Sequence, residues 1–593
     1  MVRKSLPFFH TKIVATIGPA VNTIEKMVQL MRAGMSVARL NFSHGTHEEH
    51  RLTIERLKKA REQEKQPLAI MLDTKGPEIR IGRIQNGELF LPEGHRLLLI
   101  KEEKEGNLDH ISIKPAFVLD KLTKGMHVLF DNGYIISEVV EVSAQGVEVE
   151  IQVGGIIRSG KGVNVPNEEL GLPYITEKDL EDLRFGVELD VDIIAASFVR
   201  NADQVAALKE FLKAEGKPEI LVIAKIENQR GVSNFDSIVQ IADGIMIARG
   251  DLGVEVPSSR VPQLQKMMIR KSALAGKPSI TATQMLETMM QNPRPTRAET
   301  SDVANAIYDS TSAVMLSGET AIGHYPIETV DVMRTIALEA EKDFEYREFF
   351  NRCSQREFTD IPSSITLATV KASYNTKAKA IFTFTTGGST AHLLSCFRPK
   401  MPIIAMTPNL KCYHQLALAW GVIPFYEPNV ASIEEAFEKI SAFALSRGLV
   451  NHGDLVIVTA GHPFGVRGTT NMILIDHIGE VLVQGRSGMG KQVYGNVLKL
   501  LTIESRSPWE CQAKLLVITR CDEEYDPFMR ESLGVILQNH HGDQESEEYL
   551  LKWVQKEGKS AIVYADGACH TLNDGQMVTM DPTRGLVYKG VMT

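Results

Sequence analysis

The stretch LVIAKIEN, residues 221–228, begins as a buried strand and ends in charge. Its first residues are apolar, and Lys225 and Glu227 then stand on either side of Ile226. A run this apolar is typical of a parallel strand covered on both faces, because a strand with one wet face would alternate polar and apolar residues. The sequence therefore predicts a buried strand whose end presents an ammonium group and a carboxylate.

Seven further runs in the first 320 residues resemble this one, and a segment with helical spacing follows most of them. In chain order the eight runs are KIVATIGP (12–19), SVARLNFSHG (36–45), LAIMLDTKG (68–76), DIIAASFVR (192–200), LVIAKIEN (221–228), GIMIARGDLG (244–253), SITATQML (279–286) and AVMLSGETA (313–321). Eight such units predict an α/β protein built on a (β/α)8 barrel, the TIM barrel.

Polar residues stand at the ends of most of these strands. They are Arg39, Asn41, Ser43, Asp73, Thr74, Lys225, Glu227, Arg249, Asp251, Thr283, Ser317 and Glu319. One such ending would mark no more than the start of a loop. Because the active site of a (β/α)8 barrel lies at the carboxyl ends of its strands, the repetition predicts one functional cluster.

Glu227 and Asp251 are oxygen ligands on neighbouring strands, and two carboxylates with substrate oxygens and water are a usual way to hold Mg²⁺. A pair of ion-paired acids is the alternative, since Lys225 and Arg249 are close to them in sequence. Lys225 and Arg39 are candidates for contacting a transferring phosphoryl group. The alternative is that these two cations form salt bridges with Glu227 and Asp251. The cluster of strand-end residues predicts a metal-dependent reaction on a small anionic substrate. It leaves open a Schiff base on Lys225, as in aldolases.

The chain is predicted to contain four parts. The barrel would take residues 1–76 and 177–345. Residues 77–176 are rich in β-prone residues with Gly and Asn turns, which indicates an all-β insertion able to close over the site as a lid. Alternating strands and helices return over 346–475 as an α/β domain, and 476–593 would form a further small domain.

Composition narrows the class of protein. The 593 residues are 43% hydrophobic and 23% charged, as in ordinary soluble globular proteins. The net charge of -9 argues against nucleic acid as a main partner, and no apolar run reaches the roughly 18 residues of a membrane span. The six cysteines form no C-x-x-C pair and none precedes Cys353, so we expect no zinc site or disulfide framework, no signal peptide and a cytoplasmic location.

Two glycine-rich segments suggest phosphate binding. GRSGMGKQ, residues 485–492, nearly matches the pattern G-x-x-x-x-G-K-[ST], but Gln492 replaces the hydroxyl residue and no strong α/β unit surrounds it, so we interpret it as a chance match. TTGGST comprises Thr385, Thr386, Gly387, Gly388, Ser389 and Thr390, between a strand and a helix-like segment. Those residues could cradle a phosphate at a helix start or form an ordinary tight turn, and the residues alone do not decide.

The strand-end residues, taken in order, resemble those of the pyruvate kinase family. The matching stretches are TKIVATIGPA, ARLNFSHG, LDTKGPEIR, KGVNVP, AKIEN, ARGDLGVE, TATQMLE, PRPTRAE and MLSGETA, and GHPFGVRGTTN extends the match to about residue 475. The resemblance implies a barrel, a β lid and a C-terminal α/β domain. It also implies phosphoryl transfer from phosphoenolpyruvate to ADP, giving pyruvate and ATP in the final step of glycolysis.

The resemblance assigns roles to individual residues. It implies catalytic roles for Lys225, Thr283 and Arg39; substrate binding by Arg39, Lys225, Gly250, Asp251 and Thr283; nucleotide binding by Asn41, Arg80 and Lys161; Mg²⁺ or Mn²⁺ binding by Glu227 and Asp251; and K⁺ binding by Asn41, Ser43, Asp73 and Thr74. Thr283 would lie on the path of the proton that reaches the enolate. Glu78 stands where K⁺-independent family members have Lys, so we expect activity to require K⁺.

The resemblance also bears on regulation and assembly. It makes Thr385–Thr390 and the loop around Arg467–Thr469 a candidate site for a phosphorylated effector, which would be a sugar bisphosphate, a sugar monophosphate or AMP. Family members are usually tetramers, so we expect a homotetramer.

Residues 476–593 resemble the extra domain of some bacterial members, which is akin to the swivelling phosphohistidine domain of phosphoenolpyruvate-using enzymes. No S-H-A signature occurs near residues 539–549. We therefore expect a domain without the phospho-acceptor histidine. Two rival functions remain for the whole chain: a Schiff-base lyase using Lys225, and a catalytically silent phosphate sensor.

Overall fold

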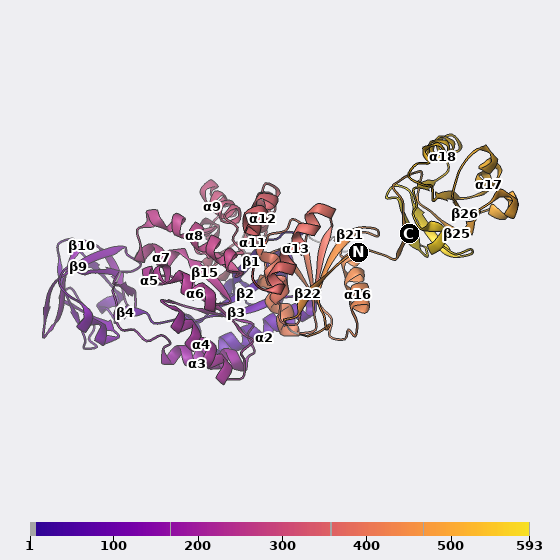
Figure 1. Cartoon of the computed structure of the whole chain (residues 1–593). Coiled ribbons are helices and arrows are strands. Elements are labelled where there is room, and N and C mark those ends of the chain that lie inside the picture. The colour runs from indigo at the N-terminus through magenta and orange to yellow at the C-terminus, as the bar shows by residue number, and fades with distance from the viewer. Residues whose placement is uncertain (1–7, 167, 356–357, 467, 592–593) are drawn as a thin grey trace.

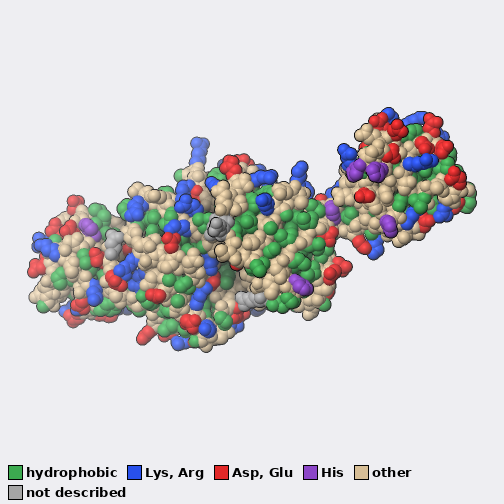
Figure 2. Space-filling model, in the orientation of Figure 1, with side chains coloured by type: hydrophobic (Ala, Val, Ile, Leu, Met, Phe, Trp, Pro, Cys, Tyr) green, Lys and Arg blue, Asp and Glu red, His purple; other side chains and the backbone are tan. Residues whose placement is uncertain are grey.

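The computed structural model describes residues 8–166, 168–355, 358–466 and 468–591. Figure 1 shows its parts in a row, with the inserted β region at one end and the C-terminal region as a separate lobe at the other. Both Figure 1 and Figure 2 show that lobe joined to the rest by a narrow connection. No helix among the described residues is both long and apolar enough to cross a bilayer.

Eight parallel strands close into a barrel in the order β1-β2-β3-β13-β14-β15-β16-β17, which confirms the predicted architecture. The strands are β1 (Lys12–Thr16), β2 (Val37–Asn41), β3 (Ala69–Asp73), β13 (Ile193–Ala196), β14 (Leu221–Ile226), β15 (Gly244–Ala248), β16 (Ser279–Ala282) and β17 (Ala313–Leu316). Nearly every residue in them is buried because the inner faces meet one another and the outer faces meet the helices. The strand register places the ends of β14 and β15 side by side.

Helices cover the outside of the barrel (Figure 1). They are α1 (Ile24–Ala33), α2 (His47–Glu64), α3 (Glu177–Glu188), α4 (Ala202–Ala214), α5 (Gln229–Ser233), α6 (Phe235–Ile241), α7 (Arg249–Glu255), α8 (Val261–Leu274), α9 (Arg297–Tyr308), α10 (Gly318–Ala321) and α11 (Pro326–Lys342). Local sequence fixes several starts. Thr46 and Glu49 form a reciprocal capping box at α2, and Thr296 and Glu299 form one at α9.

The floor of the barrel is closed by the α/β domain. The short helix η6 (Leu416–Leu418) packs Ala417 and Leu418 against the inner apolar residues of the strands. Beside it, Lys12 Nζ at the start of β1 donates to the carbonyl of Val422 at 2.7 Å. The two domains therefore share a buried core at the end of the barrel opposite the polar strand ends.

The insertion between β3 and α3 is an all-β unit. Seven of its strands close into a second barrel, in the order β10-β6-β7-β4-β12-β8-β9, and β5 pairs with β11 beside it. The strands are β4 (Ile79–Ile81), β5 (Glu88–Leu91), β6 (Arg96–Ile100), β7 (His110–Lys114), β8 (His127–Phe130), β9 (Ile135–Ser143), β10 (Gly146–Val153), β11 (Gly155–Arg158) and β12 (Gly162–Asn164). Asp179 ties its two ends together, because its carboxylate accepts from the Gly76 amide at 2.9 Å and the Thr176 hydroxyl at 2.6 Å.

The α/β domain has a five-stranded sheet in the order β20-β19-β18-β21-β22, in which only β22 is antiparallel to its neighbour. Its elements are α12 (Tyr346–Ser354), α13 (Ile361–Thr376), β18 (Ala380–Phe384), α14 (Ser389–Cys396), β19 (Ile403–Thr407), α15 (Leu410–Gln415), β20 (Val422–Tyr426), α16 (Ile433–Ser446), β21 (Leu455–Gly461) and β22 (Thr470–His477). The order leaves β20 and β22 at the edges.

The C-terminal lobe is built on an eight-stranded mixed sheet, β23-β30-β29-β25-β26-β27-β28-β24. Its elements are β23 (Val481–Gln484), β24 (Ser487–Met489), β25 (Val493–Lys499), β26 (Lys514–Ile518), α17 (Asp526–Glu531), β27 (Gly534–Leu537), α18 (Gln544–Glu557), β28 (Ala561–Val563), α19 (Ala568–Thr571), β29 (Met577–Asp581) and β30 (Leu586–Lys589). Residues 485–492 connect β23 to β25 and contain β24, and β25, not a helix, follows the glycines, whereas a phosphate-binding loop would lead into a helix. The residue boundaries predicted for the barrel, the insertion, the α/β domain and the C-terminal domain stay predictions.

Candidate functional site

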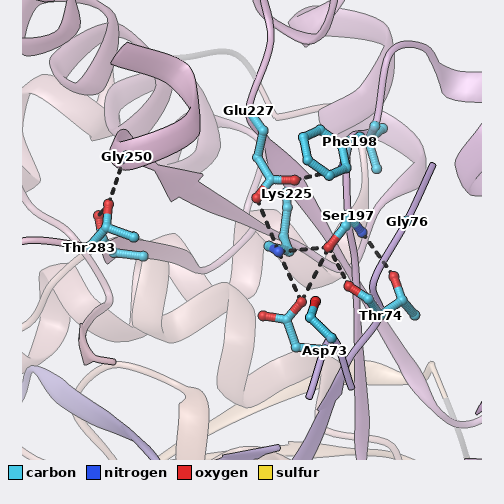
Figure 3. Close-up of polar contacts among 12 residues, drawn as sticks. Asp73, Thr74, Gly76, Ser197, Phe198, Lys225, Glu227, Gly250 and Thr283 are labelled. Atoms are coloured by element: carbon cyan, nitrogen blue, oxygen red, sulfur yellow. Dashed lines mark hydrogen bonds and ion pairs between the residues drawn. The ribbon is translucent and has the colours of Figure 1, made fainter. Parts of the chain in front are cut away.

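The ammonium group of Lys225 is the centre of the polar cluster at the strand ends (Figure 3). Its Nζ donates to Asp73 Oδ1 at 2.9 Å and to Ser197 Oγ at 2.7 Å, and Glu227 Oε1 lies 3.0 Å away. An ammonium group has three N–H donors, so all three have an acceptor. The side chain of Lys225 is almost completely buried, and acceptors at or just beyond the ends of β3, β13 and β14 fix the position of its charge.

Asp73 holds a second cation. Arg39 Nε donates to Asp73 Oδ2 at 2.6 Å, and Arg39 Nη1 donates to the hydroxyl of Thr16 at 2.9 Å. The carboxylate of Asp73 is fully buried between the two cations. The salt bridge kept as the alternative for Lys225 is thus present with Glu227, whereas Arg39 pairs with Asp73 and not with Glu227 or Asp251. The shared carboxylate of Asp73 positions the two cations side by side.

Burial and neighbouring charge oppose each other at this site. Burial disfavours the charge of Lys225, but the carboxylates of Asp73 and Glu227 outweigh it and raise the pKa of Lys225. Burial also acts against ionised Asp73, and Arg39 and Lys225 nevertheless lower its pKa. Burial raises the pKa of Glu227 to about 7, with a further increase from Asp251.

The end of β13 contributes two groups that sequence reasoning missed. Ser197 Oγ accepts from Lys225 and lies 2.6 Å from the Thr74 carbonyl, to which it donates. Phe198 has a positive φ of 52°, and its backbone N–H donates to Glu227 Oε2 at 2.7 Å. A bulky residue in this conformation is uncommon and indicates a constrained site. The polar ending of the run DIIAASFVR was the only signal available in the sequence.

Thr283 and Gly250 form a second group at the strand ends. The Gly250 amide donates to Thr283 Oγ1 at 2.8 Å, and that hydroxyl donates to the Ala282 carbonyl at 2.6 Å. Thr283 has a φ of 69°, which is a strained value for a β-branched residue. Arg249 supports this backbone by donating to the carbonyl of Thr283 at 2.7 Å.

Two polar strand ends do not join the cluster. Arg249 pairs with Asp302 at 2.7 Å, so the ion pair considered as an alternative for Asp251 is formed by a different acid. Glu319 is buried and accepts from the backbone amides of Ser317 at 2.7 Å and Leu286 at 3.3 Å. Its carboxylate holds two loops together.

The donor sets fit the two cations that the sequence implies. Burial raises the pKa of Asp251, and the charges of Glu78 and Asp73 act in the same direction. Glu227 and Asp251 are thus carboxylates that a divalent cation would relieve of their mutual repulsion. For K⁺, Asn41 and Asp73 are register partners on β2 and β3, and Thr74 follows directly. Among the described residues no group of three or more His, Cys, Asp or Glu side chains is placed to hold a metal ion alone.

The lid places two of the three predicted nucleotide residues, Arg80 and Lys161, together. β12 pairs with β4, so that Gly162 lies opposite Arg80, and Lys161 is adjacent. Each cation already has a carboxylate partner: Arg80 with Glu78 at 2.5 Å, and Lys161 with Asp131 at 2.8 Å. Asn41 is on the barrel, at the end of β2.

A cavity of about 140 Å³ lies between the lid and the barrel. Asp251, Glu78 and Phe198 line it, together with two arginines that sequence reasoning missed, Arg200 and Arg230. Across this cleft, Asn164 of the lid donates to Glu255 of α7 at 3.0 Å. The cavity therefore opens directly onto the predicted metal ligand Asp251.

The predicted effector residues form a separate cavity of about 180 Å³ in the α/β domain. Thr385, Thr386, Gly387, Ser389 and Thr390 line it, with Phe464 and Thr469 from another loop. Gly388 precedes α14 with a φ of 85°, and its amide donates to the Thr385 hydroxyl at 2.9 Å. Arg467 lies outside the described residues.

Comparisons with known proteins agree with this geometry. A family model described as "Pyruvate kinase, barrel domain" matches residues 8–330, and one described as "Pyruvate kinase, alpha/beta domain" matches residues 363–475. A curated pyruvate kinase from Geobacillus stearothermophilus is 43% identical over 98% of this chain and 98% of its own length. One from Sporosarcina psychrophila is 40% identical over 98% and 99%.

A solved structure gives the same result in three dimensions. The crystal structure of a pyruvate kinase from Cryptosporidium parvum is 36% identical and superposes with a TM-score of 0.76. It covers 79% of this chain and 96% of its own chain.

Proposed function

The chain belongs to the pyruvate kinase family and is a phosphotransferase that converts phosphoenolpyruvate and ADP into pyruvate and ATP, and we propose the part that each residue of its barrel site plays in that reaction. One observation carries the proposal. The fully hydrogen-bonded ammonium of Lys225 stands beside Glu227 and shares Asp73 with Arg39 at the strand ends, and Asp251 and Thr283 follow the ends of β15 and β16.

Lys225 and Arg39 bind the phosphoryl group during transfer. Little covalent chemistry is required of the protein in phosphoryl transfer, so positioning and charge stabilisation supply most of the rate enhancement. Asp73 holds both cations at fixed positions through contacts of 2.9 and 2.6 Å. The buried site also strengthens each charge interaction relative to water.

Gly250, Asp251 and Thr283 bind the carboxylate end of the substrate, and Thr283 lies on the path of the proton that the enolate carbon takes up. The Thr283 hydroxyl accepts from Gly250 and donates to the Ala282 carbonyl. Its own proton is thus committed to a backbone carbonyl. A bound water that exchanges protons with Thr283 is the route that fits this arrangement.

Glu227 and Asp251 would hold Mg²⁺ or Mn²⁺, and Asn41, Ser43, Asp73 and Thr74 would hold K⁺. These cations supply charge that neutralises the phosphate oxygens. Glu227 is oriented for this role by the Phe198 amide, and Asn41 Oδ1 is oriented by the Ser43 amide at 3.1 Å.

Asn41, Arg80 and Lys161 contact the nucleotide. Arg80 and Lys161 are on the lid and are balanced by Glu78 and Asp131. A nucleotide phosphate would exchange these partly buried ion pairs for contacts with its own oxygens, which draws the lid onto the barrel.

The pocket lined by Thr385–Thr390 binds a phosphorylated effector. Its support is the set of small hydroxyl residues and glycines before α14. Binding of inorganic phosphate and of sugar phosphates, measured calorimetrically with Thr385→Val as control, tests this site. Loss of affinity in the variant is expected, and equal affinity would contradict the assignment.

The chain assembles into a homotetramer. Figure 2 shows apolar side chains gathered on the visible face of the α/β domain. Leu474 and Ile475 are 39% and 47% exposed on β22, an edge strand whose outer backbone groups have no neighbouring strand in the sheet. Light scattering after gel filtration is expected to give four times the mass of the chain, and a monomer would contradict this.

The C-terminal lobe carries no phosphoryl group and serves contacts or stability. The loop before α18 contains His540 and His541, and the ring of His541 packs on Tyr564 with centroids 5.6 Å apart. Stoichiometric phosphohistidine after incubation with phosphoenolpyruvate would overturn this proposal.

The reaction is tested by measuring pyruvate formed from phosphoenolpyruvate and ADP with Mg²⁺ and K⁺, beside borohydride treatment with carbonyl substrates. Nucleotide-dependent pyruvate and no trapped adduct are expected, because Lys225 is held as an ammonium and a Schiff base needs the neutral amine. A trapped adduct on Lys225 without any need for ADP would favour the lyase. No pyruvate from the folded protein would favour the silent sensor.

A further inference from the structure

Ser197 is the least explained member of the cluster around Lys225. It belongs to no strand, since β13 ends at Ala196, and it is only 4% exposed. Its hydroxyl contacts the ammonium of Lys225 at the shortest distance of the three acceptors, 2.7 Å against 2.9 and 3.0 Å. Figure 3 shows Ser197 and Asp73 on one side of that ammonium and Glu227 on another.

The direction of each hydrogen bond at Ser197 follows from chemistry. An ammonium group can only donate and a carbonyl oxygen can only accept. Ser197 Oγ must therefore accept from Lys225 and give its single proton to the Thr74 carbonyl at 2.6 Å. Asp73 Oδ1 also lies within hydrogen-bond distance of Ser197 Oγ, at 3.3 Å, but the Thr74 carbonyl is the closer acceptor. The lone pairs of Ser197 are thus held towards Lys225.

The backbone leaves Ser197 little freedom. Its amide donates to the Thr74 hydroxyl at 3.1 Å, so two hydrogen bonds tie it to the end of β3. Gly76 packs against the same point, where an added Cβ would lie 2.8 Å from the Ser197 Cβ. Ser197 is therefore a fixed acceptor.

We propose that Ser197 is a positioning residue that keeps the ammonium of Lys225 in line with the transferring phosphoryl group. This inference rests on the role proposed for Lys225. A phosphoryl oxygen that approaches Lys225 must take one of three occupied N–H donors. The Glu227 contact is the longest and is the one replaced, while Asp73 stays fixed by Arg39 and Ser197 by Thr74.

A neutral acceptor suits this position. A third carboxylate would neutralise the charge that the phosphoryl oxygens need, whereas a hydroxyl oxygen fixes the ammonium without cancelling it. Without the Ser197 hydroxyl, Asp73 would be the only fixed acceptor left. The ammonium, at the end of a flexible four-carbon chain, could then rotate about that single contact. Misplacement of about 1 Å can cost on the order of 100-fold in rate.

The test compares Ser197→Ala and Ser197→Cys with wild type. Alanine removes the acceptor, and cysteine keeps the approximate shape with a much weaker acceptor. Both variants are expected to lose about 10- to 100-fold in kcat. The KM for phosphoenolpyruvate, and its calorimetric Kd measured with Mg²⁺ in the absence of ADP, should stay within about threefold, since Ser197 acts on the transition state.

Ser272→Ala is the matched control. Ser272 is a fully buried hydroxyl on α8 that has no hydrogen-bond partner among the described residues, so its loss should leave kcat within about twofold, as for a substitution away from any network. Lys225→Met, measured in the same series, separates the two claims. If Lys225→Met retains kcat, the role proposed for Lys225 fails.

The inference alone fails if Lys225→Met is inactive but both Ser197 variants keep kcat within about threefold of wild type. It is also overturned if kcat, phosphoenolpyruvate affinity and thermal midpoint fall in parallel in both variants, which would assign Ser197 a purely structural role. If Ser197→Ala alone does not fold, the result for Ser197→Cys decides.

Discussion

Lys12 offers a quantitative test of how the barrel is joined to the α/β domain. Its ammonium is buried at the barrel floor, where Nζ donates to the Val422 carbonyl at 2.7 Å. Burial lowers the pKa of Lys12 from 10.5 to about 8, and the charge of Glu341 only partly opposes this. That change corresponds to a cost of about 3 kcal/mol for the buried charge at neutral pH. Lys12→Met removes the charge and one hydrogen bond worth about 1 kcal/mol, so the variant should be more stable by about 2 kcal/mol at pH 7.

The sign of the pH dependence follows from the lowered pKa. Between pH 8 and 10.5 the unfolded chain binds more protons at Lys12 than the folded chain does, so the stability of wild type rises with pH in this window. Below pH 8 the ammonium is charged in both states and its cost is constant. The advantage of Lys12→Met should therefore be largest at pH 7 and shrink towards pH 10.

Urea unfolding followed by circular dichroism at pH 7 and pH 10 measures this difference. Lys26→Met is the matched control, because Lys26 Nζ also donates to a backbone carbonyl, that of Ala20 at 2.6 Å, but is exposed to solvent. Lys26→Met should show no such pH-dependent gain. A Lys12→Met variant that is less stable than wild type at pH 7, or whose difference from wild type is the same at both pH values, would refute the reasoning.

Three further substitutions test other parts of the molecule. Asp73→Asn leaves two buried cations without their shared carboxylate, so urea unfolding should show a loss of about 3–5 kcal/mol and the assay a large fall in kcat; a stability within 1 kcal/mol of wild type would contradict the network. Leu418→Ala opens a cavity where η6 closes the barrel floor, and it should destabilise the protein by about 2–5 kcal/mol while the KM for ADP stays unchanged; an unchanged unfolding curve would argue against that packing. Glu78→Lys should reduce the ratio of rates in K⁺ and Na⁺, because a fixed ammonium replaces the monovalent charge; a ratio equal to that of wild type would remove Glu78 from the explanation.

The sequence predicted the barrel well because its signal is repeated. Eight buried runs share one pattern, and their shared geometry puts Lys225, Glu227 and Asp73 at one end of one structure. The prediction of a cluster needed no knowledge of side-chain direction. Residues at the carboxyl ends of parallel strands in a closed barrel lie around the same opening.

The partners of those residues were not predictable in the same way. The Ser197 hydroxyl reaches Lys225 because β13 pairs with β14 in one particular register, with Ala196 opposite Ala224. The Phe198 amide reaches Glu227 because Phe198 adopts a positive φ, which its residue type disfavours. The first contact depends on the pairing of two strands and joins residues 28 apart in the sequence, and the second depends on local backbone strain at Phe198.

Polar strand ends also misled in part. Glu319 follows an apolar run as Glu227 does, yet its carboxylate accepts backbone amides instead of facing the cluster. Arg249 precedes Asp251 by two residues, but its guanidinium turns outward to Asp302. Sequence position gives the strand end, whereas the backbone after the strand decides where a side chain points.

Lys225 stabilises the phosphoryl group during transfer, and single-turnover kinetics measures this role directly. Wild type or Lys225→Met would be mixed, in excess over phosphoenolpyruvate, with saturating ADP, Mg²⁺ and K⁺. The reactions would be quenched at successive times and the ATP formed would be measured. Lys225→Met is expected to bind phosphoenolpyruvate but to transfer its phosphoryl group at least about 1,000-fold more slowly than wild type, a factor that corresponds to removing a principal charge from the transition state. A transfer rate within about tenfold of wild type would contradict the role of Lys225 in stabilising the phosphoryl group during transfer.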